Sequence, residues 1–255
     1  MAQKKHKEWF NGDLAQLLAH KISEVYPQFN RQGLVTDIEE SVAQLELKAR
    51  LSCFSDRLNN YLPNSYPQAI EILVSILGTE NPNETGIMSQ YYWTLPMATF
   101  VEEYGLEHYA ESIDAIAEIT KRSTGEFAIR PYLRSEPDKT LEIMQQWSLD
   151  DNFHLRRLAS EGTRTRLPWA TKLTFLIKNP QPALPILNNL QDDPIRFVQK
   201  SVANHINDIL KDNYDMGMNL IHHWLQDAST ARKWIIKHAL RYQVKDGNPE
   251  AIEIR

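Results

Sequence analysis

The chain has 255 residues, 42% of them hydrophobic and 24% charged, which is the composition of a globular protein with a continuous apolar core. Its single cysteine excludes a disulfide framework and a cysteine-rich zinc module. No stretch approaches the roughly 18 apolar residues of a membrane span. No apolar segment follows the basic start MAQKKHKEWF either, so we expect a soluble, cytoplasmic protein.

Charge is distributed unevenly along the chain, whose net charge is −5. Residues 1–120 hold 8 basic and 17 acidic side chains, whereas residues 121–255 hold 20 basic and 16 acidic ones. We expect a single domain over 1–255, with an acidic N-terminal helical part (1–120) and a basic part (121–255). This asymmetry is compatible with a local nucleic-acid-binding surface, and equally with a chance imbalance between solvated faces.

Helical periodicity predominates, and strand-like alternation is hard to find. Apolar residues recur at i, i+3, i+4 and i+7 in four segments: 14–26, 47–62, 66–77 and 108–120. Proline and glycine fall between these segments, and Pro67 stands where a first helical turn tolerates proline. The fold class is therefore predicted to be all-α.

The second half contains an internal repeat. The segments LRRLASE (155–161), VQKSVAN (198–204) and ARKWIIK (231–237) each follow a polar, Asp-containing turn. Their offsets of 43 and 33 residues are typical of paired-helix solenoids with HEAT-like repeats. We expect the second helix of each pair to line a concave DNA-binding groove. The seventh positions, Glu161, Asn204 and Lys237, then face the same way.

Three carboxylates and one tryptophan are candidates for chemistry. The carboxylates are Glu126 in TGEFAIRPYL, Glu161 in LASEGTR and Asp208 in NHIND. The simpler interpretation of each is an ion pair with a neighbouring arginine, such as Arg130 or Arg157. Trp169, in RLPWA, is either a core residue or an aromatic surface for a sugar or base.

Metal and nucleophile chemistry is weakly supported. His222 and His223 are adjacent and so point in different directions on a helix. HExxH, CxxC, a phosphate-cradling glycine loop and a nucleophile elbow are all absent from the sequence. We expect no metal and no cofactor.

The motifs GTRTRLPWA, SVANHINDILKD, TGEFAIRPYL and KWIIKHALR together resemble the DNA alkylation repair glycosylases of the AlkC group, relatives of AlkD. The resemblance covers nearly the whole chain. It implies an α-solenoid that hydrolyses the N-glycosidic bond of cationic alkylated bases: N3-methyladenine, and also N3-methylcytosine and N1-methyladenine. It further implies that the base is not fully flipped out of the duplex.

The resemblance also implies roles for individual residues. Glu126, Glu161 and Asp208 match the catalytic carboxylates, Trp169 matches a sugar-contacting tryptophan, and Arg157 matches a basic position beside the site. Thr165 departs from an expected proline. Gln199 and Lys200 replace an arginine pair, so we expect a weakened phosphate contact at Gln199. The candidate DNA-binding residues are Arg156, Arg157, Arg164, Arg166, Lys172, Lys200, Asn204, Arg232, Lys233, Lys237 and Arg241.

This assignment is chemically coherent. An alkylated base that is already cationic leaves as a neutral molecule, so no general acid is required. Positive charge then develops on the deoxyribose, where fixed carboxylates stabilise it and can activate water, while arginine and lysine hold the phosphates. We expect a monomer whose partner is duplex DNA with alkylated bases, and no membrane partner. The alternative is a non-catalytic HEAT-repeat protein that binds DNA structures or serves as a scaffold.

Overall fold

A computed structural model describes residues 5–86 and 89–254 of the chain. Every regular element within these ranges is a helix, so the predicted all-α class is confirmed. The chain forms two compact units, Met1–Ile129 and Arg130–Arg255. The boundary between the units lies close to the predicted change in charge at residue 120. The expectation of one domain over 1–255 stays a prediction.

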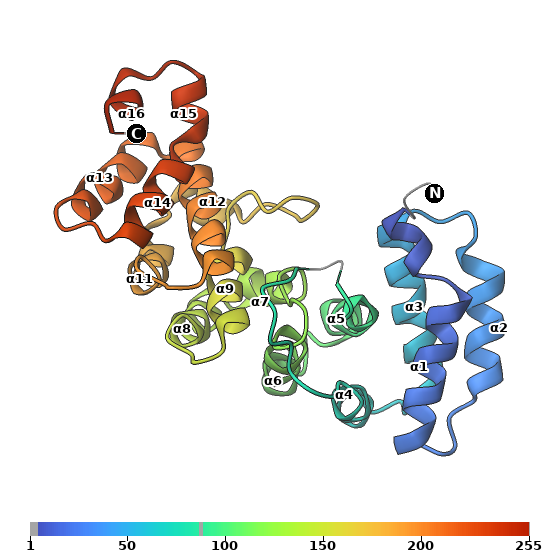
Figure 1. Cartoon of the computed structure of the whole chain (residues 1–255). Helices are drawn as coiled ribbons and strands as arrows, with labels where there is room; N and C mark the ends of the chain where they lie inside the picture. Colours follow the sequence, from blue (N-terminus) through green and yellow to red (C-terminus); the bar gives the residue numbers. More distant parts are fainter. Residues whose placement is uncertain (1–4, 87–88, 255) are drawn as a thin grey trace. The chain divides into compact units, whose positions relative to one another are not determined.

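The first unit consists of short amphipathic helices (Figure 1). They are η1 (His6–Trp9), α1 (Gly12–Val25), α2 (Arg31–Val42), α3 (Leu47–Tyr61), α4 (Tyr66–Ser75), η2 (Tyr92–Thr94), α5 (Leu95–Tyr104) and α6 (Tyr109–Thr120). Helix α1 packs on α2, α2 on α3, α3 on α5, and α4 on α6. The four helices predicted from periodicity correspond to α1, α3, α4 and α6.

Local signals explain where these helices begin. The side chain of Asn11 accepts a hydrogen bond from the Leu14 amide, and that of Asn30 accepts one from Gly33, so both asparagines are N-caps. Pro67 lies in the first turn of α4, where its missing N–H costs no helical hydrogen bond.

The second unit is also built from short helices. Its helices are α7 (Ile129–Ser135), α8 (Pro137–Trp147), α9 (Phe153–Gly162), α10 (Thr174–Lys178), η3 (Gln181–Ala183), α11 (Leu184–Asn189), α12 (Arg196–Asp212), α13 (Tyr214–Leu225), α14 (Thr230–Ala239), α15 (Arg241–Lys245) and α16 (Pro249–Ile254). None of the helices in the described ranges has the length and apolar character that crossing a bilayer would require.

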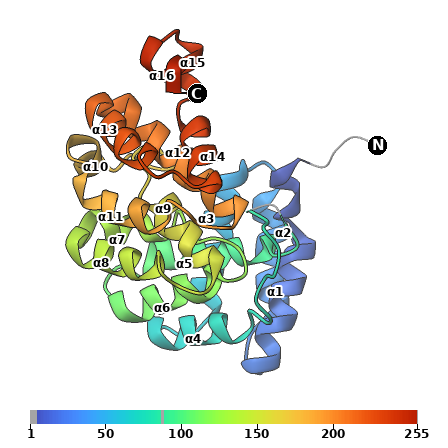
Figure 2. The same ribbon diagram turned by 60° about the vertical axis from the view of Figure 1, so that its left-hand side comes forward.

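The three repeat segments lie in α9, α12 and α14. Helix α12 packs against both α9 and α14, as Figures 1 and 2 show. Each of these three helices also packs on a helix that precedes it in the chain: α9 on α8, α12 on α10 and α14 on α13. Val198, Val202 and Ile206 form a fully buried stripe along α12. The repeat is therefore confirmed as a series of helix pairs, in which the second helices, α9, α12 and α14, pack side by side.

Candidate active site

The second residue of each repeat segment binds a polar turn. Arg156 Nε donates to Asp193 Oδ2 at 2.6 Å, and the Gln199 side chain donates to the Asp193 carbonyl at 2.7 Å. Arg232 Nε donates to Asp192 Oδ1 at 3.1 Å. Gln199 is buried, and its side chain holds this turn inside the unit. The weakened phosphate contact expected there stays a prediction.

The third residue of each segment lies differently. Lys200 and Lys233 are exposed, as is Lys237 one turn further along α14. Arg157 lies with its guanidinium carbon 4.9 Å from the centre of the Phe197 ring and its Nη2 3.7 Å from Glu161 Oε1. The predicted DNA-binding set therefore contains side chains held by turns and side chains that face solvent. Its role in binding stays a prediction.

Glu161 is buried at the end of α9, with 6% of its surface exposed. Its Oε1 accepts a hydrogen bond from Arg164 Nη1 at 2.7 Å, and its Oε2 accepts one from the Ser201 hydroxyl of α12 at 2.6 Å. Both oxygens are thus fixed by donors, which holds the carboxylate in one orientation.

Asp208 lies on α12, two helical turns after Ser201, and is also buried. Its Oδ2 accepts a hydrogen bond from Arg164 Nε at 2.8 Å, while Lys211 Nζ lies 3.9 Å from Oδ1. The Arg164 guanidinium therefore bridges two of the three predicted catalytic carboxylates, and these two come from neighbouring repeat helices. Like Glu161 and Asp208, Arg164 is buried.

The two carboxyl groups differ in pKa. Burial raises the pKa of Glu161, but Arg157, Arg164 and the Ser201 hydroxyl outweigh it, so the net shift is downward. For Asp208, burial outweighs the attraction of Arg164 and Lys211, and its pKa is raised. Oppositely shifted neighbours are typical of sites that divide chemical roles between two groups.

A buried histidine lies close to this pair. His205 is fully buried on α12, and burial, followed by the Arg164 charge, lowers its pKa to about 3. The imidazole is therefore neutral at physiological pH and adds no charge beside the carboxylates.

A loop of irregular backbone, residues 163–173, connects α9 to α10 and carries Trp169. Trp169 is 65% exposed, which contradicts its interpretation as a core residue. Its φ of 64° lies in the left-handed region, which a bulky side chain rarely adopts and which costs about 1–3 kcal/mol. The surrounding structure must hold the loop for this conformation to persist.

Part of that hold comes from Asp212 at the end of α12. Asp212 Oδ1 and Oδ2 each accept a hydrogen bond from Arg166 Nε at 2.9 Å, and Oδ2 also accepts one from Thr165 Oγ1 at 3.2 Å. Arg166, a predicted DNA-binding residue, is thus part of the structure of the loop. On the same helix, Asn204 accepts a hydrogen bond from Arg241 Nη2 at 2.9 Å.

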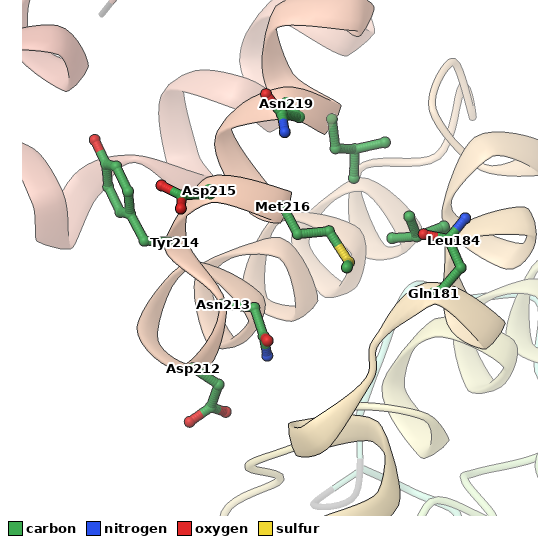
Figure 3. A pocket seen from close by; sticks show the side chains of 9 residues that line it. Gln181, Leu184, Asp212, Asn213, Tyr214, Asp215, Met216 and Asn219 are labelled. Carbon is green, nitrogen blue, oxygen red and sulfur yellow. The ribbon is translucent and has the colours of Figure 1, made fainter.

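Asp212 also borders an open pocket of about 710 Å³ (Figure 3). The pocket is lined by Gln181, Leu184, Asp212, Asn213, Tyr214, Asp215, Met216, Asn219 and Leu220. Glu161 and Asp208 are not among these residues, so this hollow is not built around the carboxylate pair.

Glu126 belongs to the first unit and is described separately. It is buried in the turn after α6, where its Oε2 accepts a hydrogen bond from Thr124 Oγ1 at 3.0 Å. Its backbone amide donates to the same hydroxyl at 3.2 Å, so Thr124 orders both the turn and the carboxylate. Its predicted catalytic role stays a prediction.

Sequence reasoning missed several residues of this site. Ser201, Asp212 and the bridging geometry of Arg164 were not predicted. A signal for Ser201 existed, since Ser201, Asn204 and Asp208 follow i, i+3, i+7 spacing and so share one face of α12. In the described part of the chain, no group of three or more His, Cys, Asp or Glu side chains could hold a metal ion.

Comparison with known proteins identifies the family. Residues 102–242, more than half of the chain, match the family described as DNA alkylation repair enzyme. The uncharacterized protein YhaZ of Bacillus subtilis (strain 168) is 36% identical over 249 residues, which are 97% of this chain and 67% of the relative.

Comparison with a solved structure supports the same family. The Pseudomonas fluorescens alkylpurine DNA glycosylase AlkC, bound to DNA containing an abasic site analog, matches with a TM-score of 0.89 and 35% identity. The match covers 99% of this chain and 68% of that one. The predicted likeness to the AlkC group and the HEAT-like repeat fold are thereby confirmed, and the chain belongs to the DNA alkylation repair enzyme family.

Proposed function

We propose that the protein is a monofunctional DNA glycosylase that hydrolyses the N-glycosidic bond of cationic alkylated bases in duplex DNA. One observation carries the proposal: two buried carboxylates, Glu161 and Asp208, are held on adjacent repeat helices by one guanidinium, that of Arg164. The family match and the similarity to AlkC supply the context of alkylation repair.

The chemistry uses the charge of the lesion itself. As the bond from C1′ to the base nitrogen breaks, the electron pair passes to the base, which leaves neutral, and positive charge develops on the sugar. The Glu161 and Asp208 carboxylates stabilise this cation, and one of them orients the water that attacks C1′. That water transfers a proton to the carboxylate that orients it as the C1′–O bond forms, and the products are the free base and an abasic deoxyribose.

Arg164 prevents mutual repulsion of the two carboxylates before substrate binds. Two carboxylates in a buried site would otherwise raise each other's pKa, and one would be protonated. A bridging guanidinium keeps both charges in a fixed geometry, so little reorganisation is needed when the sugar cation appears.

DNA binding is assigned to the exposed basic side chains of the repeats. Lys200, Lys233 and Lys237 contact phosphates, and Trp169 presents its ring to the deoxyribose beside the lesion. We propose N3-methyladenine as a substrate, together with N3-methylcytosine and N1-methyladenine, and excision without complete extrusion of the base. The protein acts as a cytoplasmic monomer.

The test is base release under single-turnover conditions. Duplex DNA carrying N3-methyladenine, and separately N3-methylcytosine or N1-methyladenine, is incubated with excess protein. Free base is measured by chromatography, and abasic sites by alkaline strand cleavage. We expect stoichiometric release without strand cleavage before alkali treatment. Specific binding to branched DNA with no base release from any lesion would favour the non-catalytic DNA-binding or scaffold alternative.

A further inference from the structure

A second buried arginine, Arg130 on α7, lies inside the second unit with 1% of its surface exposed. Its Nη1 donates to the carbonyl oxygens of Gly162 at 3.1 Å and Arg164 at 2.9 Å. Its Nε and Nη2 both donate to the carbonyl of Thr171, at 3.1 and 2.5 Å. One guanidinium thus satisfies three backbone carbonyls.

These carbonyls mark the two ends of the loop 163–173. Gly162 and Arg164 stand where α9 ends, and Thr171 stands where the chain returns toward α10. The Leu173 amide donates to Thr165 O at 3.3 Å, which closes the loop a second time. Between these ends, the chain exposes Trp169 in its left-handed conformation.

The chemistry of this contact favours arginine specifically. A planar guanidinium presents several N–H donors in a fixed fork, whereas a lysine ammonium is a compact point charge on a flexible stem. Burial of a cation is costly, and hydrogen bonds to carbonyl oxygens offset that cost only where the geometry is fixed. The loop and the guanidinium therefore order each other.

We propose that Arg130 is a positioning residue of the excision site. By closing the loop, it holds Trp169 in its exposed orientation. By binding the Arg164 carbonyl, it also fixes the backbone from which Arg164 reaches Glu161 and Asp208. The effect on catalysis rests on the proposed function, whereas the effect on the loop does not.

The first unit offers a matched control, Arg50 of α3. Arg50 is also buried, and it donates to the carbonyl oxygens of Leu45 at 2.8 Å, Phe10 at 2.9 Å and Ala43 at 3.1 Å. Arg50→Met therefore removes an equivalent set of buried arginine–carbonyl bonds within the first unit. It separates a general loss of stability from a specific effect on the loop.

The first experiment measures the loop without DNA. Trypsin cuts after arginine and lysine, and Arg166 and Lys172 both lie in the loop. In Arg130→Met, we expect the initial rate of cleavage at these two positions to rise at least tenfold, at a temperature where circular dichroism shows a folded chain. Wild type and Arg50→Met should be cleaved there at equal rates. Hydrogen exchange of the 164–173 amides should change in parallel.

The second experiment is a double-mutant cycle on excision of N3-methyladenine. Trp169→Ala should slow wild-type excision at least tenfold but slow Arg130→Met by less than threefold, because Trp169 is already misplaced in that background. In Arg50→Met, Trp169→Ala should retain its full effect. Arg130→Lys, which keeps the charge without the fork, replaces Arg130→Met in both experiments if the latter fails to fold.

A folded Arg130 variant whose loop is cleaved at the wild-type rate would overturn the proposal. So would a Trp169→Ala effect of the same size in the wild-type and Arg130 backgrounds. If wild-type protein releases no base, the proposed function fails, and the cleavage and exchange measurements still decide whether Arg130 holds the loop.

Discussion

The two units share helical architecture but differ in what they bury. Among the described residues of Met1–Ile129, the buried charged side chains are Arg50 and Glu126. In the second unit they are Arg130, Glu161, Arg164, Asp193 and Asp208. Three of these, Glu161, Arg164 and Asp208, are directly bonded to one another. The described residues of the first unit pack their helices without such a cluster.

This difference indicates which buried charges the helical fold requires and which it does not. Replacing buried ion pairs by well-packed apolar residues is often neutral or stabilising, so such clusters are weak evidence for stability. Perturbed titratable groups in a buried cluster are typical of functional sites instead. On the proposed function, the second unit retains these buried charges for the excision chemistry rather than for the stability of the fold.

The largest expected effect is on stability. Arg164→Met leaves two buried carboxylates without their bridging cation, and removal of one partner from a buried pair costs about 3–5 kcal/mol. Urea unfolding followed by circular dichroism measures the change. The control in the first unit is Lys121→Met, which breaks a partly exposed pair with Glu118 and should cost about 0–1 kcal/mol. Equal losses of unfolding free energy in the two variants would contradict the claim that only the second unit depends on a buried charge cluster.

The next effect is on catalysis. Glu161→Gln and Asp208→Asn preserve shape but remove a charge that opposes the sugar cation, so each should slow single-turnover excision by a factor on the order of 10²–10³. Affinity for DNA should stay equal or rise slightly. The matched control is Glu118→Gln, a paired carboxylate of the first unit, which should excise at the wild-type rate.

Melting temperatures measured beside these rates decide the interpretation. If the carboxylates were only structural, activity would fall in proportion to the fraction of unfolded protein. A stable Glu161→Gln variant with the full excision rate would remove Glu161 from the site.

Acid should separate activity from stability. The pKa of Asp208 is raised by burial, so as pH falls its carboxylate is protonated earlier than an exposed aspartate, and excision should decline tenfold per pH unit below that point. Because the folded-state pKa is above the unfolded one, this protonation does not itself destabilise the fold. The pKa of Glu161 is lowered, and its stabilisation is lost only as pH falls further, through that lower value.

A pH window should therefore exist in which the protein is folded but slow. Single-turnover rates and circular dichroism, each measured across the acid range, test this order, with enzyme-free DNA as the control for spontaneous base loss. In Asp208→Asn, the excision rate should not show this decline at acid pH. Unfolding that coincides with the loss of rate in wild-type protein would contradict the assignment.

The sequence predicted helices better than it predicted contacts. Periodicity located α3 within one residue, because an amphipathic stripe is a local property of the chain. Glu161 and Asp208 were candidates from their positions, but their catalytic role was predicted from a family resemblance. Arg164, which was predicted only to bind DNA, bonds to a carboxylate 44 residues away, and the register of two packed helices sets that contact. A local sequence pattern does not predict how two helices far apart in the chain align when they pack.

The same limit explains the basic residues of the repeats. The repeat pattern alone presents Arg156 and Arg157 as two adjacent cations, and the family resemblance placed Arg157 beside the site. In the structure, the Arg156 guanidinium binds Asp193 and the carbonyls of Asp150 and Asp151, whereas Arg157 lies beside Phe197 and Glu161. The packing of the repeats, which the local pattern does not encode, gives Arg156 its turn and Arg157 its contact with Glu161.

The smallest expected effect tests this distinction on DNA. Affinity for undamaged duplex should fall with salt with a log–log slope of about −0.9 per phosphate neutralised. Lys200, an exposed third-position residue, should flatten that slope by roughly one contact when changed to alanine. Arg232→Ala should change it less, because the Arg232 guanidinium is held by Asp192 and a phosphate would have to displace that carboxylate.

Fluorescence anisotropy across a salt series measures both slopes. Equal flattening by the two variants would mean that Arg232 leaves Asp192 on binding. If Lys200→Ala leaves the slope unchanged, the phosphates of bound DNA do not contact the exposed face of α12.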